Sequence, residues 1–373
     1  MSTRFYYIPF LLLPALACKQ TYDPPAISHP PNNLVVEGWI ETNGSDSTIF
    51  TLSRTVKLDS NAYTPETGAT VVLEDSGQNS YPLQQTQPGT YSYPPFAFNP
   101  NTSYRLRITA GGKDYASAYV PLVSSPPLDS VNFVRQQTEA NNGVQIYASS
   151  HDPQNRTHYY RWQYQETWEF HSAVEATVQF DPNSRSIYTI LPGLGYVCWQ
   201  NNNSTDIVLT STTQLNSDVA YKVPVVFIPN GSQKLTVRYS ALVKQHGLTK
   251  DAFTWWQTLQ KNTEQIGSIF GVQPSANPGN IRCLTDTSEQ VLGFVGGGNT
   301  QTQRIFITND QIKPWDYKTD CEDATVSPTA FYNYWVQGYL PWLQETPSGL
   351  VHYEYKTCVD CRLTGTDVRP SFW

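Results

Sequence analysis

The sequence lacks an excess of positive charge, and its N-terminal apolar run is too short to cross a bilayer. Lys and Arg number 24 against 31 Asp and Glu, which gives a formal net charge of −7 at pH 7. An acidic chain is repelled by nucleic acid and by anionic lipid surfaces, so we expect no nucleic-acid partner. The apolar stretch between Arg4 and Cys18 is roughly 13 residues long, whereas a membrane-spanning helix needs about 20.

The sequence also lacks the local motifs of common enzymes. It contains no G-x-S-x-G nucleophile elbow, and the glycine-rich residues 293–298 lack the Lys-Ser/Thr pair of a phosphate loop. We expect this glycine run to form a tight hairpin. Glu166 and Glu169 are separated by an odd number of positions on an expected strand, so their carboxylates point to opposite faces and do not form a glycosidase pair. The sequence therefore predicts a protein that is not an enzyme and uses no cofactor.

Cysteine is scarce, and its spacing argues against a zinc centre. The C-x-x-C pair of Cys358 and Cys361 has no nearby histidine, whereas a zinc site needs four ligands. Five cysteines follow Cys18, so at least one of them has no partner within this set. Structural disulfides are the expected role in an oxidising compartment. The expected pairs are Cys198 with Cys283, and Cys321 with either Cys358 or Cys361.

The N-terminus carries the pattern of a cleavable leader that ends at a cysteine. Residues 1–17 are typical of a signal peptide. Ala15, Leu16 and Ala17 precede Cys18 in a spacing that resembles the lipobox of bacterial lipoproteins, so we predict lipidation at Cys18. Residues 18–32 are rich in proline and predict a semi-rigid tether. The alternative is an ordinary secretory signal, after which Cys18 joins a disulfide.

Abundant strand-forming and turn-forming residues predict a mainly β protein with two domains. Aromatic residues make up 13% of the chain, which also contains 27 Pro and 22 Gly, a composition typical of many short strands and turns. Residues 33–125 predict an immunoglobulin-like or prealbumin-like β-sandwich, and prolines within residues 124–130 mark its boundary. Residues 126–373 predict a larger β-rich domain with one inserted helix near residues 249–266.

Aromatic residues gather at two further places in the second domain. One strand pattern carries aromatic side chains on a single parity, namely Tyr160, Trp162, Tyr164, Trp168 and Phe170. This period of two forms one aromatic face, which is either core or a carbohydrate-stacking platform, and core is the favoured interpretation. We expect Phe372 and Trp373 to dock on the second domain, because two large aromatic side chains gain free energy by leaving water.

Several longer stretches carry a resemblance to a known family. They are LVVEGWI and LSRT in the first domain, then HDPQNRTHYYRWQYQETWEF, Cys198-Trp199, VRYSALVKQHGLTKDAF, NTEQIGSIFGVQPS, GNIRCLTD, CVDCRLTG and RPSFW. In these stretches the chain closely resembles a Bacteroidota lipoprotein family known as domain of unknown function 4249. The resemblance covers nearly the whole mature sequence and is most specific over residues 237–286. It implies an outer-membrane lipoprotein whose gene lies beside that of a TonB-dependent receptor, and it assigns no functional residues.

Two classes of function are consistent with these features. The first is a non-enzymatic lipoprotein, anchored in the outer membrane and exposed on the cell surface. It would assist a TonB-dependent receptor by capturing a small-molecule or peptide ligand. The alternative is a surface-anchored glycan-binding protein or hydrolase. A pocket lined by two carboxylates about 5–9 Å apart would favour the hydrolase.

Overall fold

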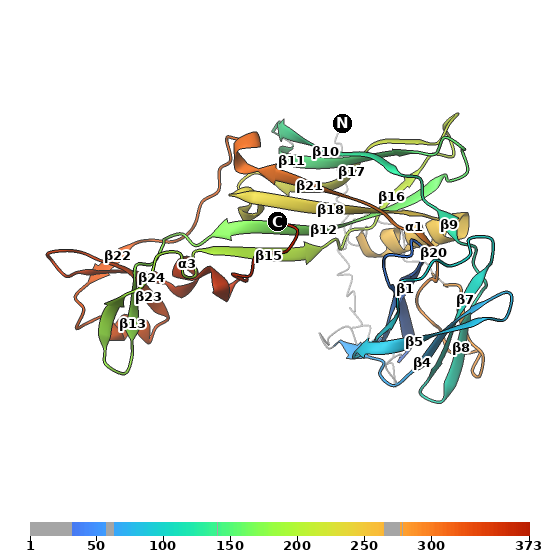
Figure 1. Cartoon of the computed structure of the whole chain (residues 1–373), viewed down its shortest axis with the longest axis horizontal. Helices are drawn as coiled ribbons and strands as arrows, with labels where there is room; N and C mark the ends of the chain where they lie inside the picture. The colour runs from blue at the N-terminus through green and yellow to red at the C-terminus, as the bar shows by residue number, and fades with distance from the viewer. Residues whose placement is uncertain (1–31, 57–62, 140, 265–276, 278) are drawn as a thin grey trace, which may run out of the picture.

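The computed structural model describes residues 32–56, 63–139, 141–264, 277 and 279–373. The protein is mainly β, with 48% strand and 10% helix. Its strands form three groups, which we name the N-terminal, central and distal lobes (Figure 1). The predicted signal peptide, most of the tether and Cys18 lie outside the described residues.

The N-terminal lobe is built from short strands that curl around one apolar core. They are β1 (Leu34–Glu41), β2 (Thr48–Arg54), β3 (Thr64–Pro65), β4 (Thr70–Asp75), β5 (Ser80–Gln87), β6 (Thr90–Tyr93), β7 (Tyr104–Ala110), β8 (Lys113–Ser117) and β9 (Val123–Ser124). Apolar residues recur at alternate positions in several of these strands, and Leu34, Val36 and Ile40 of β1 are buried. The antiparallel path β8-β7-β4-β5-β6-β2-β1 encloses this core.

Residues 281–299 return to the N-terminal lobe from the far part of the sequence. β19 (Ile281–Cys283) extends the sheet at β8, and β20 (Gly297–Asn299) lies parallel between β1 and β9. The hairpin expected for residues 293–298 is therefore wrong. The glycines serve close backbone approach instead, since a Cβ on Gly298 would lie 2.0 Å from the carbonyl oxygen of Val123. Residues 281–299 fall within the predicted second domain, which begins at residue 126. They nevertheless complete the sheet of the N-terminal lobe.

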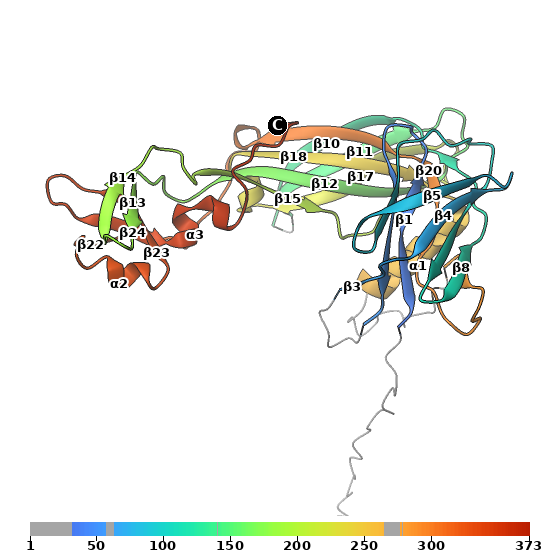
Figure 2. The ribbon, with the colours of Figure 1, turned by 60° about the horizontal axis from the view of Figure 1, so that its bottom comes forward.

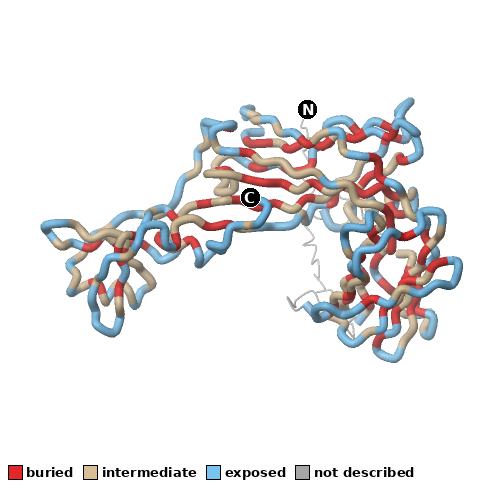
Figure 3. The backbone as a smooth tube through the Cα atoms, in the orientation of Figure 1, coloured by how far each residue is buried: buried red, intermediate tan, exposed pale blue. Residues whose placement is uncertain are grey.

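The central lobe packs two layers of long strands face to face (Figures 1 and 2). One layer contains β10 (Leu128–Gln137), β11 (Asn142–His151) and β17 (Val219–Pro229). The other contains β12 (Tyr159–His171), β15 (Val197–Asn203), β16 (Val208–Ser211), β18 (Arg238–Gly247) and β21 (Gln301–Thr308). The even-numbered aromatic residues of β12, among them Tyr160, Trp162 and Phe170, are buried in the core between the layers. The burial colours of Figure 3 show many buried positions along the central strands. The prediction that they form a core face is confirmed.

A single long helix covers the other face of β12. α1 (Lys250–Glu264) begins after Thr249, whose side-chain oxygen accepts a hydrogen bond from the backbone N–H of Ala252 at 3.2 Å. The predicted helix ran to residue 266, and its last two residues lie outside the described chain. Phe253 packs on Tyr159 with ring centroids 4.9 Å apart, so the odd-numbered face of β12 is turned toward α1.

The distal lobe extends from the end of the central strands. It contains β13 (Val178–Asp181), β14 (Ser186–Thr189), β22 (Ala324–Val326), β23 (Tyr339–Gln344), β24 (Val351–Tyr355), α2 (Tyr332–Trp335) and α3 (Lys356–Val359). Three 3₁₀ turns, η1 (Gln233–Leu235), η2 (Asn309–Gln311) and η3 (Cys361–Leu363), lie in the connections. A small aromatic cluster around Phe180, Phe331 and Tyr353 forms its core. None of the helices in the described part of the chain is long and apolar enough to span a bilayer.

Two disulfides fasten the distal lobe and its base. Cys321 pairs with Cys358, which was one of the two expected partners. Cys198 pairs with Cys361 rather than with Cys283, so that prediction is wrong. Cys283 has a free thiol and is buried in the core of the N-terminal lobe, because β19 carries it away from β15.

The C-terminal aromatic residues dock on the central lobe, as the sequence predicts. The indole N–H of Trp373 donates to Glu169 at 2.8 Å, and its ring lies 5.7 Å from that of Phe306. The guanidinium of Arg304 lies 3.6 Å from the ring centroid of Phe372. These contacts fix the tail on the outer face of the long strands.

Deletion of residues 368–373 is therefore expected to destabilise the central lobe. The loss of Trp373 burial alone amounts to about 2–4 kcal/mol by area bookkeeping. The melting midpoint should fall and proteolysis of residues 126–367 should accelerate, while fragments from residues 33–125 keep their protease resistance. Limited proteolysis with mass spectrometry measures this, and an unchanged digestion pattern would show that the docking contributes no stability.

Candidate functional site

A cavity of about 720 Å³ lies where the N-terminal lobe, α1 and the central sheet meet. Small-molecule sites commonly have volumes of about 300–1,000 Å³ and lie between domains. Its walls come from β1, β12, β18, α1 and the returning segment before β20. Apolar and aromatic side chains dominate the lining, which includes Trp39, Ile207, Trp255, Trp256, Leu259, Leu292 and Phe294. Figure 2 shows α1 lying beside the N-terminal strands at this junction.

Arg161 brings a positive charge to the cavity wall, where its side chain is half-buried. It lies on the odd-numbered face of β12, with its guanidinium 3.5 Å from the ring centroid of Trp256. Burial lowers the pKa of Arg161 to about 10, and the nearby negative charge of Glu37 partly opposes this shift. The side chain is thus cationic at neutral pH. Its Nε is buried and has no hydrogen-bond partner among the described residues, and an unsatisfied buried donor costs free energy.

His246 lies directly opposite Arg161 on the neighbouring strand β18 and also lines the cavity. Its Nδ1 is 3.2 Å from the hydroxyl oxygen of Thr300, and that hydroxyl donates its proton to the buried carboxylate of Glu41. The Nδ1–H of His246 must therefore be the donor to Thr300, which leaves Nε2 as an acceptor. The side chain is only 7% exposed, and Nε2 has no partner among the described residues.

Burial, the charge of Arg161 and that of Lys244 together lower the pKa of His246 to about 3. His246 is thus neutral at physiological pH, and Nε2 can only accept a hydrogen bond. A third polar atom without a partner, the indole Nε1 of Trp255, belongs to a residue of the same wall. Seven buried side-chain N or O atoms of the described residues lack a partner, and three of them belong to residues that line this one cavity. Each of the three atoms has almost no accessible surface in this structure, so they lie within the cavity wall rather than on its open surface. The volume of the cavity, its place between the lobes and its aromatic lining make it the candidate site.

The low pKa of His246 predicts an acid-induced loss of stability. The unfolded chain takes up a proton at this side chain near its ordinary pKa of about 6.5, whereas the folded chain does so only near pH 3. Stability is therefore lost as the pH falls below about 6.5. Between pH 7 and pH 4.5 this amounts to about 2–3 kcal/mol. In His246→Gln the loss of unfolding free energy over this pH range should be smaller by this amount, and urea unfolding at both pH values measures it. An identical loss in both proteins would contradict the burial of a neutral His246.

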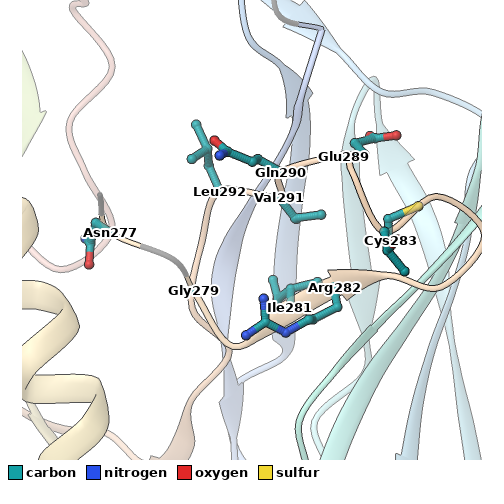
Figure 4. A pocket seen from close by; sticks show the side chains of 10 residues that line it. Asn277, Gly279, Ile281, Arg282, Cys283, Glu289, Gln290, Val291 and Leu292 are labelled. Carbon is teal, nitrogen blue, oxygen red and sulfur yellow. The ribbon is translucent and has the colours of Figure 1, made fainter. Parts of the chain in front are cut away.

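A second, smaller cavity of about 260 Å³ adjoins the first and shares Asn277 and Leu292 with it. Figure 4 shows Ile281 and Val291 on its opposing segments, with the thiol of Cys283 nearby. None of the buried unpartnered polar atoms of the described chain belongs to a residue of this lining. The larger cavity is therefore the better candidate for a ligand-binding site.

The cysteines and the two glutamates that the sequence singled out lie away from the large cavity, whereas the predicted helix and Gly293 of the glycine run line it. Cys198, Cys321, Cys358 and Cys361 form the two disulfides, and Cys283 lines only the smaller cavity. Glu166 is buried in the central core, where it pairs with Lys234 at 2.6 Å, whereas Glu169 binds Trp373 on the outer face. No group of three or more His, Cys, Asp or Glu side chains in the described ranges is arranged to hold a metal ion.

Sequence reasoning missed Arg161 and His246. Arg161 did carry a signal, because it is a charged residue between buried aromatic neighbours on a long strand. Its partner could not be located, since the pairing of β12 with β18 joins residues 85 positions apart, the difference between 246 and 161.

Comparisons with known proteins place the chain in a family without assigning an activity. No curated protein matches the sequence. Among solved structures, a crystal structure of a Salmonella alpha-2-macroglobulin mutant aligns with 7% identity over 87% of this chain and 17% of that chain. The TM-score is 0.19, so the similarity supports no conclusion about fold. The model of a domain of unknown function (DUF4249) matches residues 19–304. This match spans more than half of the 373 residues, and the chain therefore belongs to the DUF4249 family.

Proposed function

We propose that the protein is a non-enzymatic, lipid-anchored lipoprotein of the outer-membrane surface that captures a small molecule for a TonB-dependent receptor. The observation that carries the capture role is the large cavity between the lobes, which apolar and aromatic side chains line together with the charged Arg161 and Glu37. The lipobox-like residues before Cys18 support the anchor. The resemblance of the sequence to surface lipoproteins encoded beside such receptors supports the partner.

We also propose that residues 33–125 form an immunoglobulin-like or prealbumin-like sandwich. The antiparallel strands β1, β2, β5 and β6 and the strands β4, β7 and β8 surround a shared apolar core, which supports this assignment. In this arrangement the lobe supplies β1 as one wall of the cavity. A rigid lobe of this kind suits a binding site, because its wall keeps its shape before the ligand arrives.

Co-purification tests the proposed partnership. The full lipidated chain, extracted in mild detergent from its own membranes, should bring down a TonB-dependent receptor that mass spectrometry identifies. A mock extraction from cells without the chain is the control. Recovery of the chain without any such receptor would overturn the assigned role.

The anchor has its own test in Cys18→Ser. Without the thiol the lipid cannot be attached, so the protein should leave the membrane fraction or accumulate unprocessed. Membrane fractionation after a high-salt wash measures this, with Cys283→Ser as a matched control that keeps the anchor. Retention of Cys18→Ser in washed membranes would contradict lipidation at Cys18.

A further inference from the structure

We infer that the large cavity takes an uncharged small molecule with an apolar ring system, which binds by covering aromatic and aliphatic side chains of the wall. This inference rests on the proposed capture function and names the ligand class of that same site. It is carried by six apolar residues of the lining that keep accessible surface, namely Trp39, Ile49, Trp255, Leu259, Leu292 and Phe294. None of these six is part of the apolar cores of the three lobes.

The N-terminal lobe turns a second apolar face toward the cavity. Trp39 and Ile49 are paired across β1 and β2, while their neighbours Ile40 and Phe50 are buried in the core of the lobe. Successive side chains of a strand point to opposite faces, so Trp39 and Ile49 lie outside that core. Ile49 is 48% exposed. An apolar ligand that covers this side chain gains the free energy of removing its surface from water.

The returning segment and α1 contribute apolar surface in the same way. Val291 is buried in the N-terminal core, whereas Leu292 and Phe294 line the cavity, and Leu292 is 39% exposed. Figure 4 shows the side chains of Val291 and Leu292 leaving the segment in different directions. On α1, Trp255 and Leu259 are four positions apart and therefore share one helix face. Three elements thus present uncovered apolar surface to one space, which is typical of a binding site.

The charged residues of the lining disfavour an ionic ligand. Glu37 and Arg161 are the two described residues of the lining that are charged at neutral pH, and their opposite charges act on each other. A ligand of either sign is attracted by one of them and repelled by the other. The uncharged polar residues keep accessible surface, so water satisfies them and they require no polar group from the ligand; they are Gln163, Thr205, Thr263 and Asn277.

The aromatic content of the wall favours a ring over an alkyl chain. The ring centroids of Trp255 and Phe294 are 5.8 Å apart, and those of Trp255 and Trp256 are 4.8 Å apart, distances at which aromatic rings attract each other. A ligand ring adds edge or offset contacts to this cluster, whereas an alkyl chain gains from burial alone. Arg161 is a positioning residue, because its guanidinium lies 3.5 Å from the ring centroid of Trp256 and holds that ring by stacking.

Calorimetric titration of residues 18–373 carrying Cys18→Ser tests this assignment, because the unlipidated chain needs no detergent that would absorb apolar probes. The uncharged fused ring 2-naphthol should bind. The same ring with one charge, as 2-naphthoate or 2-naphthylmethylamine, should bind at least about 10-fold more weakly. The alkyl chain of 1-octanol should bind at least about 3-fold more weakly, and galactose should not bind measurably. Equal or tighter binding of any of these four probes, or no binding of 2-naphthol, would overturn the inference.

Matched variants connect binding to the cavity. Leu292→Gln removes apolar surface from the wall and should weaken 2-naphthol binding at least about 3-fold. Leu215→Gln makes the same change at a residue that is 56% exposed outside the lining, and it should bind normally. Trp255→Leu keeps an apolar side chain but removes a ring, so it should weaken 2-naphthol more than 1-octanol. Unaltered binding of 2-naphthol by both cavity variants would place the bound probe elsewhere and refute the assignment.

The positioning role of Arg161 has its own readout. Arg161→Met releases the ring of Trp256 and should weaken 2-naphthol binding at least about 3-fold, whereas Arg161→Lys keeps a cation at the ring and should lose less. Equal affinity of the original protein and Arg161→Met for 2-naphthol would show that the guanidinium does not hold this wall in place.

The two proposals can fail separately. A chain that co-purifies with a receptor but binds an ionic probe or galactose at least as tightly as 2-naphthol would refute the uncharged ring and leave the capture role standing. Binding of 2-naphthol by a chain that brings down no receptor would refute the receptor role and leave the ligand class standing.

Discussion

Replacement of both Cys198 and Cys361 by serine is expected to lower the free energy of unfolding by about 5 kcal/mol. The disulfide joins residues 163 positions apart, and in the chain-entropy model a loop of this length contributes about that much by restricting the unfolded chain. It also fixes η3 beside β15 at the base of the distal lobe. Urea unfolding of the oxidised proteins measures the difference.

Two other variants calibrate this result. The bond between Cys321 and Cys358, 37 positions apart, closes a shorter loop. Its removal should lower the free energy of unfolding by about 4 kcal/mol or less. Cys283→Ala alters the free thiol and leaves both disulfides intact, so its effect should be far smaller. Equal destabilisation by Cys283→Ala and by the Cys198/Cys361 double variant would contradict the observed pairing.

Arg161→Met is expected to stabilise the ligand-free protein by about 1–3 kcal/mol, although most substitutions of buried residues destabilise. The arginine is a half-buried cation with no salt bridge among the described residues and with a buried, unpartnered Nε, and an apolar side chain of similar length removes the cost of its desolvation. The lost stacking on Trp256 offsets part of the gain. Urea unfolding in ligand-free buffer measures the change.

The matched control for this effect is Arg156→Met, which removes a positive charge from an exposed turn. Its stability should stay within about 0.5 kcal/mol of the original protein. A large loss of stability in Arg161→Met would mean that the guanidinium is satisfied within the protein.

The features that sequence reasoning predicted are those determined by local pattern. The alternation from Tyr160 to Phe170 identified a buried strand face, and the cap at Thr249 identified the start of α1. The docking of Trp373 followed from the cost of exposing a large ring. Each of these depends on neighbours in sequence or on burial alone.

The features that it missed depend on long-range pairing. The glycines of residues 293–298 have the composition of a local turn, but they instead allow β20 to pack between β1 and β9. The same return of the chain places Cys283 in the N-terminal lobe, out of reach of Cys198. The candidate site also arises from register, because only the pairing of β12 with β18 brings Arg161 and His246 together.

Native mass spectrometry of the full lipidated chain, extracted in mild detergent from its own membranes, tests the central claim most directly. The original protein should carry a population with one bound small molecule, and Arg161→Met from the same cells should carry less of it. Arg156→Met should retain the bound species. Ligand-free masses for all three proteins, or the same bound population on Arg161→Met, would contradict the claim that the cavity beside α1 is a site for a small-molecule ligand.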